Sequence, residues 1–268
     1  MIRPPAVAGQ FYERNPEALR RDVESRLDRK AAPAAAFGCV CPHAGYVYSG
    51  DVAGATLSAA KIPPAVVVLS FSHRGMGARY ALWPEGAWQT PLGDAPVDEA
   101  LTAKLLDGSS LLEPDVAAFA HEHSGEVILP FLQVLRPDVR IVMVSVYPAS
   151  PLKHLETLGR EMAEILCQEK ERPLLVASSD MTHHMPAPDA ERMDRMAVDA
   201  MLRLDPAGLF RVVQEHDISM CGVCPVTAML VSAKALGATS ARLVRYENSG
   251  KATGDYDSVV AYAGVVVE

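Results

Sequence analysis

The sequence lacks several features that would each indicate a specialised class of protein. Its 268 residues contain no apolar run approaching the roughly 18–20 residues of a membrane span. The first residues, MIRPPAVAGQFYERNPEALRR, contain no signal-like apolar segment. Positive charge is not in excess either, because 25 Lys and Arg stand against 33 Asp and Glu, giving a net charge of −8. We therefore expect neither a membrane protein nor a nonspecific nucleic-acid binder, and we predict a cytoplasmic location.

Cysteine is scarce, and its odd count of five argues against a disulfide scaffold. Cys221 and Cys224 have the spacing of a redox pair or of half a zinc knuckle. A zinc ribbon requires a second close pair, but Cys39 and Cys41 lie in a strand-like run instead. A thioredoxin-type pair opens a helix directly after a strand, whereas the residues before Cys221 resemble a helix end and a loop. The sequence therefore favours reduced thiols without a two-cysteine site.

The composition is that of an ordinary globular protein, with 49% hydrophobic and 22% charged residues. Short β-like runs alternate with amphipathic helical stretches, and no internal repeat is present. This alternation predicts one α/β domain over residues 1–268, with three layers (α/β/α) and a central mixed sheet. The predicted strands are 37–41, 65–70, 140–146, 173–179, 241–247 and 258–267, the last two as an antiparallel pair. The predicted helices are 15–30, 51–60, 98–106, 125–135, 152–169, 190–204, 206–214 and 226–236, with a hairpin or loop over 80–96.

Three predicted strands are each followed by histidine. FGCVC (37–41) leads to His43, AVVVLS (65–70) leads to His73, and PLLVASS (173–179) leads to His183. Ligands of open α/β sheets bind outside the carboxyl ends of the strands. If these strands are parallel, the three histidines converge on one edge of the sheet and form a shared site.

A further polar group, HEHSGE (121–126), precedes an apolar run. Helix capping explains part of it, with Ser124 as the N-cap and Glu126 in the first turn. His121 and His123 can both face solvent, or one of them can line the cleft.

Seven stretches together resemble the Memo family, whose members occur in eukaryotes, archaea and bacteria. They span nearly the whole chain in one order: RPPAVAGQFY (3–12), PHAGYVYSG (42–50), SFSH (70–73), EHSGEVILPF (122–131), SSDMTHH (178–184), MCGVCP (220–225) and YENSG…DSVVAYAG (246–264). The resemblance implies the fold of the class III extradiol dioxygenases, which are non-haem iron enzymes that open catechol rings.

The same resemblance implies a metal cleft. His43 and His73 match the two family histidine ligands, and Cys221 matches the third ligand, where the dioxygenases carry a carboxylate. Asp180 and His183 match the remaining polar residues of the cleft, with His183 at the position of the acid/base histidine. The resemblance places His123 near the cleft as well, as a third candidate for catalysis.

Two histidines and one carboxylate form the facial triad of non-haem Fe(II) oxygenases, and a thiolate in place of the carboxylate keeps one negative charge but softens the site. Fe(II) is the expected metal, with copper and zinc as alternatives. The first functional hypothesis is a metal-dependent dioxygenase or related oxidoreductase. The others are a non-catalytic module that binds a phosphorylated or otherwise anionic ligand in the cleft, and a zinc hydrolase. The family association also suggests a radical-SAM system partner.

Two positions depart from the usual family pattern. Arg74 follows His73 where many relatives carry a second histidine, and it can bind an anionic group or face solvent. SSDMTHH has an extra histidine, His184, which we assign to the outer part of the site or to solvent. Cys224 is expected to be packed and inert.

Overall fold

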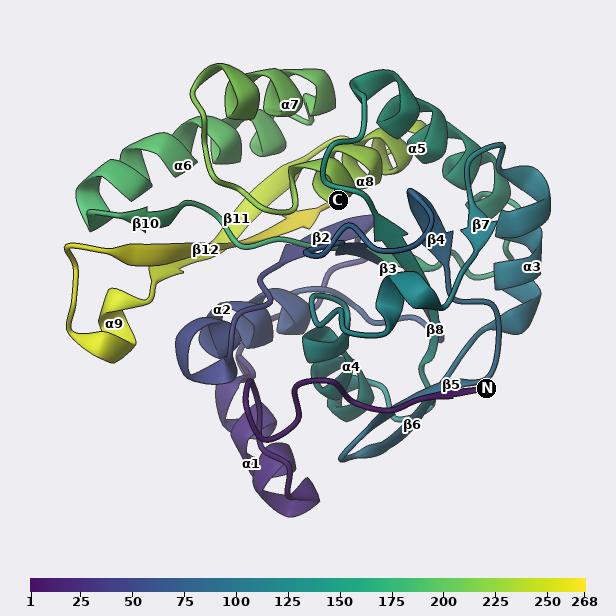
Figure 1. Ribbon diagram of the computed structural model, residues 1–268, viewed down its shortest axis with the longest axis horizontal. Helices are drawn as coiled ribbons and strands as arrows, with labels where there is room; N and C mark the ends of the chain where they lie inside the picture. The colour runs from purple at the N-terminus through teal and green to yellow at the C-terminus, as the bar shows by residue number, and fades with distance from the viewer.

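The fold is built on a nine-stranded mixed sheet (Figure 1). The computed structural model describes residues 1–268. Along the sheet the order is β10 (His183–Met185), β12 (Val259–Val267), β2 (Gly38–Cys41), β9 (Leu174–Ser178), β3 (Ala65–Phe71), β8 (Arg140–Val146), β4 (Tyr80–Leu82) and β7 (Glu113–Pro114), with β11 (Ala241–Asn248) paired to β12. The central strands β2, β9, β3 and β8 are parallel, whereas β12 is antiparallel to both β2 and β11. The predicted mixed sheet and closing antiparallel pair are therefore confirmed.

The central strands are apolar on both faces, because each face is covered by helices. Successive side chains of a strand point to opposite faces. Accordingly Cys39 and Cys41 lie in one hydrophobic core, while Val40 between them lies in the other. The two cysteines thus share a face, as the strand periodicity predicts, and both are fully buried free thiols.

Helices form the two outer layers (Figure 1). One core is completed by α3 (Glu99–Gly108), α5 (Leu152–Leu166), α6 (Ala187–Leu202), α7 (Pro206–Glu215) and α8 (Val223–Ala235), and the other by α1 (Pro16–Arg26), α2 (Tyr46–Ser58) and α4 (Leu129–Leu135). The short helix α9 (Gly250–Thr253) joins β11 to β12, and 3₁₀ turns occupy Ala117–Phe119 (η1) and Glu126–Ile128 (η2). This is the predicted three-layer α/β/α architecture. None of the helices is both long enough and apolar enough to cross a membrane.

Helix α1 begins as its sequence predicts, since the Asn15 side chain accepts a hydrogen bond from the Ala18 N–H at 3.0 Å and Pro16 occupies the first turn. Helix α2 begins at Tyr46, five residues before the predicted start. Nearly all of α2 is buried, so it shows little of the amphipathic pattern on which the prediction depended. A Cβ at Gly54 would come within 2.4 Å of the Arg26 carbonyl oxygen, so a glycine is needed where α1 and α2 meet.

The prediction of one capped helix over 125–135 is wrong. The segment forms η2 followed by α4, and neither has a side-chain N-cap. The Ser124 hydroxyl instead binds the end of β3: it donates to the Phe71 carbonyl at 2.8 Å and accepts from the Phe71 N–H at 3.1 Å. Glu126 is fully buried and forms an ion pair with Arg3 at 2.6 Å. Tertiary contacts thus take both side chains away from the local capping role.

Glu126 anchors the N-terminal segment to the domain. Its carboxylate also accepts hydrogen bonds from the backbone N–H groups of Ala6 and Val7 and from the Tyr12 hydroxyl, at 2.6–3.0 Å. The N-terminal strand β1 (Ile2–Arg3) belongs to a small separate sheet, in which it pairs with β5 (Ala87–Thr90). β5 and β6 (Gly93–Pro96) form an antiparallel hairpin, which confirms the hairpin predicted within 80–96.

We expect Glu126→Gln to destabilise the protein, because it leaves the buried Arg3 guanidinium without its counter-charge. Breaking a buried ion pair in this way costs about 3 kcal/mol. The exposed Glu13→Gln in the same region is the matched control, with an expected change within about 0.5 kcal/mol. Urea denaturation measures both, and equal stabilities of the two variants would contradict the anchoring role.

Candidate metal centre

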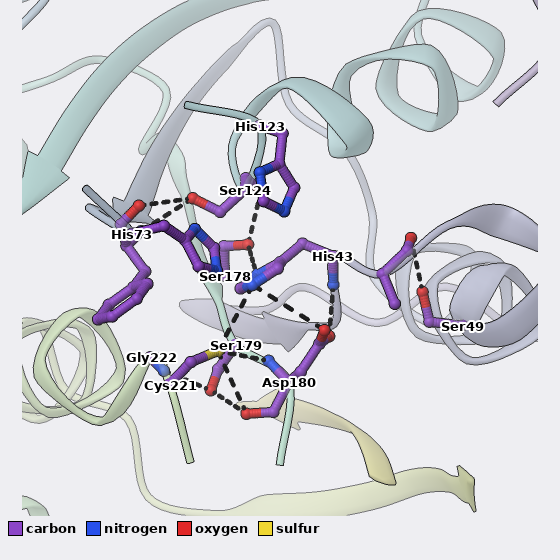
Figure 2. Close-up of polar contacts among 12 residues, drawn as sticks. His43, Ser49, His73, His123, Ser124, Ser178, Ser179, Asp180, Cys221 and Gly222 are labelled. Atoms are coloured by element: carbon purple, nitrogen blue, oxygen red, sulfur yellow. Dashed lines mark hydrogen bonds and ion pairs between the residues drawn. The ribbon is translucent and has the colours of Figure 1, made fainter. Parts of the chain in front are cut away.

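Three central strands are each followed by a polar residue two positions after the strand ends, at the same edge of the sheet. β2 ends at Cys41 and His43 follows two residues later; β3 ends at Phe71, before His73; β9 ends at Ser178, before Asp180. The strands are parallel, and Cys41 pairs with Ser178 across β2 and β9. The three side chains therefore project from the same carboxyl edge, where ligands bind in open α/β sheets (Figure 2).

Three histidines form the centre of the site. Ligand nitrogens of His43, His73 and His123 all lie within 4.8 Å of one another. The rings of His73 and His123 are stacked with centroids 4.5 Å apart, and that of His43 lies edge-on to both, at 5.1 and 5.7 Å. Of the three histidines predicted to converge, His43 and His73 lie in this group, whereas His183 lines the cavity beside it without belonging to the group. The third member is His123, from the loop before η2. His121 is exposed.

Hydrogen bonds at Nδ1 fix the ring orientations of two of the histidines, His43 and His73. His43 Nδ1 lies 2.7 Å from the Ser178 hydroxyl, and that hydroxyl donates to the Ser124 carbonyl at 2.6 Å. The hydroxyl proton is thereby used, so Nδ1 of His43 is the donor. His73 Nδ1 donates to the Glu122 carboxylate at 2.9 Å. In both rings the unprotonated nitrogen is Nε2, the atom free to bind a metal.

The electrostatics keep the imidazoles of His43 and His123 neutral. Burial, reinforced by the neighbouring histidines, lowers the pKa of His43 to about 3 and that of His123 to about 4. Burial alone would raise the pKa of Glu122, but the hydrogen bonds from His73 and from backbone N–H groups outweigh it and lower that pKa to about 2. At neutral pH the rings of His43 and His123 therefore present lone pairs near the ionised carboxylate of Glu122. This donor set fits a divalent transition metal.

Cys221 lies on the other side of His43, with its sulfur 3.4 Å from Nε2 of that ring and 3.2 Å from the Asp180 backbone N (Figure 2). Burial and the neighbouring Asp180 raise the pKa of the thiol, the opposite of what a nearby helix N-terminus alone would do. Cys221 is therefore a thiol that a bound cation would have to deprotonate. Cys224 is buried and its sulfur lies 3.1 Å from the Pro148 carbonyl oxygen, and both thiols are free.

Asp180 and His183 complete the polar side of the site. The Asp180 carboxylate accepts the His43 backbone N–H at 2.7 Å, and its second oxygen lies 4.0 Å from His43 Nε2. Burial raises the pKa of Asp180. The ring of His183 donates from Nδ1 to the Ser219 carbonyl at 2.9 Å, which leaves Nε2 as a hydrogen-bond acceptor.

A cavity of about 420 Å³ opens above this group. Its lining comprises Phe11, His43, Ala44, Gly45, Tyr48, His73, His123, Asp180, His183, His184, Ser249, Thr253, Ser258, Val260 and Tyr262. No lysine or arginine is among them, and Arg74 is exposed without lining the cavity. His184 lies at the rim, exposed and with a φ of 58°. A surface cavity of about 570 Å³ near Lys61 and Arg172 contains none of the predicted site residues.

The sequence did not indicate two of the residues that orient the histidines, Glu122 and Ser178. Glu122 stands between two histidines in HEHSGE, a context that could have identified it as their partner. Ser178 is the last residue of a buried strand, and nothing local distinguishes it from a structural serine.

The fold and the histidine cluster together define an α/β protein with a candidate mononuclear metal centre at the carboxyl edge of its parallel strands. The chain belongs to the Memo family: the family model described as Memo-like protein matches residues 3–266. It is 37% identical to a MEMO1 family protein of Methanopyrus kandleri, over 99% of each chain, and 38% identical to one of Methanothermobacter thermautotrophicus, over 98% of this chain and 99% of the relative.

Among solved structures, the chain resembles an uncharacterized protein from Escherichia coli K12. The TM-score is 0.56 at 17% sequence identity, with 86% of this chain and 99% of the other covered. This likeness concerns the fold.

We expect the metal-free protein to lose stability as the pH falls from about 6.5 to about 4. In this window the unfolded chain protonates His43 and His123, whose folded pKa values are about 3 and about 4, so the unfolded state binds more protons. The loss should be on the order of a few kcal/mol. The contribution of Glu122, whose pKa is also lowered, is lost separately, below its unfolded value of 4.5.

Urea denaturation of chelator-treated protein at several pH values measures this slope. His43→Asn should flatten it, whereas His216→Asn, at an exposed position, should leave it unchanged. The same slope in all three proteins would mean that the buried imidazoles are not held neutral.

Proposed function

We propose that this protein is a metal-dependent oxidoreductase that uses dioxygen on a small aromatic or other organic substrate. His43 and His73 would hold a divalent metal, Fe(II) by preference, together with a third donor from Cys221 or His123. The supporting observation is the group of three imidazoles, with ligand atoms within 4.8 Å of one another, at the base of a cavity that also contains Asp180 and His183.

A bound Fe(II) would supply open coordination positions and the one-electron chemistry that dioxygen requires. The protein supplies position and proton transfer. His183, with its proton fixed on Nδ1 by the Ser219 carbonyl, offers Nε2 as a base toward a substrate hydroxyl. Asp180, whose pKa is raised by burial, lies near His43 and can hold a proton or orient a bound water.

The cavity wall favours an uncharged aromatic substrate. Phe11, Tyr48 and Tyr262 provide flat apolar surface, and the hydroxyls of Ser249, Thr253 and Ser258 provide neutral hydrogen-bonding groups. A phosphate group is normally bound by arginine or lysine, and neither lines this cavity. The lining therefore favours a phenol-like ligand over the phosphorylated peptide of the binding-module hypothesis.

A zinc hydrolase is a second candidate, favoured by the third histidine. Three imidazoles and an activated water form a known catalytic zinc set. In this case Asp180 or His183 would accept the proton of the attacking water.

We expect protein purified without a metal-affinity tag to retain or take up one divalent metal per chain. After anaerobic Fe(II) loading, it should consume oxygen in the presence of one or more members of a catechol panel, because the site can hold substrate and dioxygen together. Elemental analysis and an oxygen electrode measure the two properties. His43→Ala, which removes a ligand, is the control and should abolish both.

Other outcomes decide between the hypotheses. Retained zinc with ester or amide hydrolysis and no oxygen uptake would favour the hydrolase. Micromolar binding of a phosphotyrosine peptide that survives Cys221→Ser, without turnover, would favour the binding module. A protein that refuses iron, copper and zinc would contradict a metal centre.

Single substitutions identify the third donor. We expect Cys221→Ala to weaken Co²⁺ binding by at least tenfold, because a thiolate ligand and its negative charge are lost. Cys224→Ala should change the affinity less than twofold, since its sulfur lies against the Pro148 carbonyl rather than the histidines. The absorption of Co²⁺ reports thiolate ligation directly.

His123→Ala, measured alongside, separates the two donor sets. A larger loss from His123→Ala than from Cys221→Ala, without thiolate absorption in the wild type, would assign the third position to His123. Equal losses from the two cysteine variants would restore the two-thiol hypothesis.

A further inference from the structure

Glu122 is a buried carboxylate that gathers hydrogen bonds from two of the three histidine segments. Its side chain is 4% exposed. One oxygen accepts from His73 Nδ1 at 2.9 Å and from the backbone N–H groups of His123 and Ser124, both at 2.8 Å. The other oxygen accepts from the His73 backbone N–H at 2.7 Å. Four N–H donors thus converge on one side chain.

No lysine or arginine side chain forms an ion pair with this carboxylate. Its charged-group contacts are with histidines alone, the rings of His73 at 2.9 Å and His123 at 3.8 Å. The guanidinium of Arg3 reaches the same residue, but it binds the backbone carbonyl and directs its charge to Glu126. A buried carboxylate without a cation is costly unless it is fully hydrogen-bonded, and here the donors come from the metal-site loops.

We propose that Glu122 is a positioning residue for metal binding, which fixes the tautomer of His73 and raises the basicity of its Nε2. An ionised carboxylate only accepts hydrogen bonds, so the proton of His73 must stay on Nδ1 and the lone pair on Nε2. The backbone N–H of His73 binds the same side chain, so main chain and ring are held together. This inference rests on the metal centre proposed above.

The three imidazoles differ in what supports them. His73 is supported by a carboxylate and His43 by the neutral Ser178 hydroxyl. The ring of His123 makes no hydrogen bond, since its nearest carboxylate oxygen is 3.8 Å away. Removing the charge of Glu122 should therefore alter His73 selectively. The partners behind metal-bound histidines typically change metal affinity 10–100-fold when they are mutated.

Glu122→Gln tests this role, because glutamine keeps the shape but carries only one acceptor oxygen and turns an NH₂ group toward N–H donors. The matched control is Glu126→Gln, which also removes a buried charge but touches no histidine ring. Two measurements are made on each protein: the tautomer of His73 in the metal-free state, by ¹⁵N–¹H long-range NMR correlation, and the affinity for Co²⁺ alone.

In the wild type and in Glu126→Gln, His73 should carry its proton on Nδ1, with Co²⁺ affinities within about threefold of each other. Glu122→Gln should give a mixture of His73 tautomers and bind Co²⁺ about 10–100-fold more weakly. A purely structural carboxylate would lower stability in both variants and leave the tautomer unchanged.

The failures of the two proposals are distinguishable. If the wild type binds Co²⁺, and Glu122→Gln binds it equally well with an unchanged tautomer, the positioning role is overturned while the metal centre stands. If the wild type binds none of Co²⁺, Fe²⁺ and Zn²⁺, the metal centre is overturned. The role of Glu122 in metal binding is then overturned as well, whichever tautomer His73 adopts.

Discussion

The parallel pairing of β2, β9 and β3 is the constraint on which the site depends. Parallel strands finish at the same edge, and here each carries its polar residue two positions beyond its last paired residue: His43, Asp180 and His73. Cys41 and Ser178 pair and face the same side of the sheet, so the even offset keeps His43 and Asp180 in step. Phe71 is one residue out of phase with them, because Leu69 pairs with Ala177, so His73 is directed to the site by its loop and by its hydrogen bonds to Glu122.

The edge of the sheet is a costly place for polar groups, because they are removed from water. Hydrogen bonds between the short loops at this edge satisfy these polar groups. Ser124 joins the end of β3, its carbonyl accepts from Ser178 of β9, and Glu122 holds His73. Residues 122–124 thus connect the ends of β3 and β9 through hydrogen bonds. The same loop continues into Glu126, which holds the N-terminal segment whose Phe11 packs against His123.

The distribution of charge explains why the site can serve a metal. Burial keeps His43 and His123 neutral, the form in which imidazole binds a metal, and it disfavours the thiolate of Cys221. A divalent ion would oppose the effect of burial only at the thiol, because it favours a deprotonated sulfur ligand. The cavity above is walled by aromatic and hydroxyl groups and contains no lysine or arginine, so the principal positive charge at its base would be that of the metal.

The sequence by itself determined the α/β class, the mixed sheet and the convergence of His43 and His73, because strand periodicity and the position of a residue after a strand are local properties. The distinction between Cys221 and Cys224 came from the resemblance to the Memo family and stays a prediction. The tertiary structure decided the rest. Ser124 and Glu126 have the local signature of a helix cap, yet long-range partners at Phe71 and Arg3 use them instead. The place of His123 beside the other histidines, and the support from Glu122 and Ser178, depend on contacts between segments that sequence spacing does not encode.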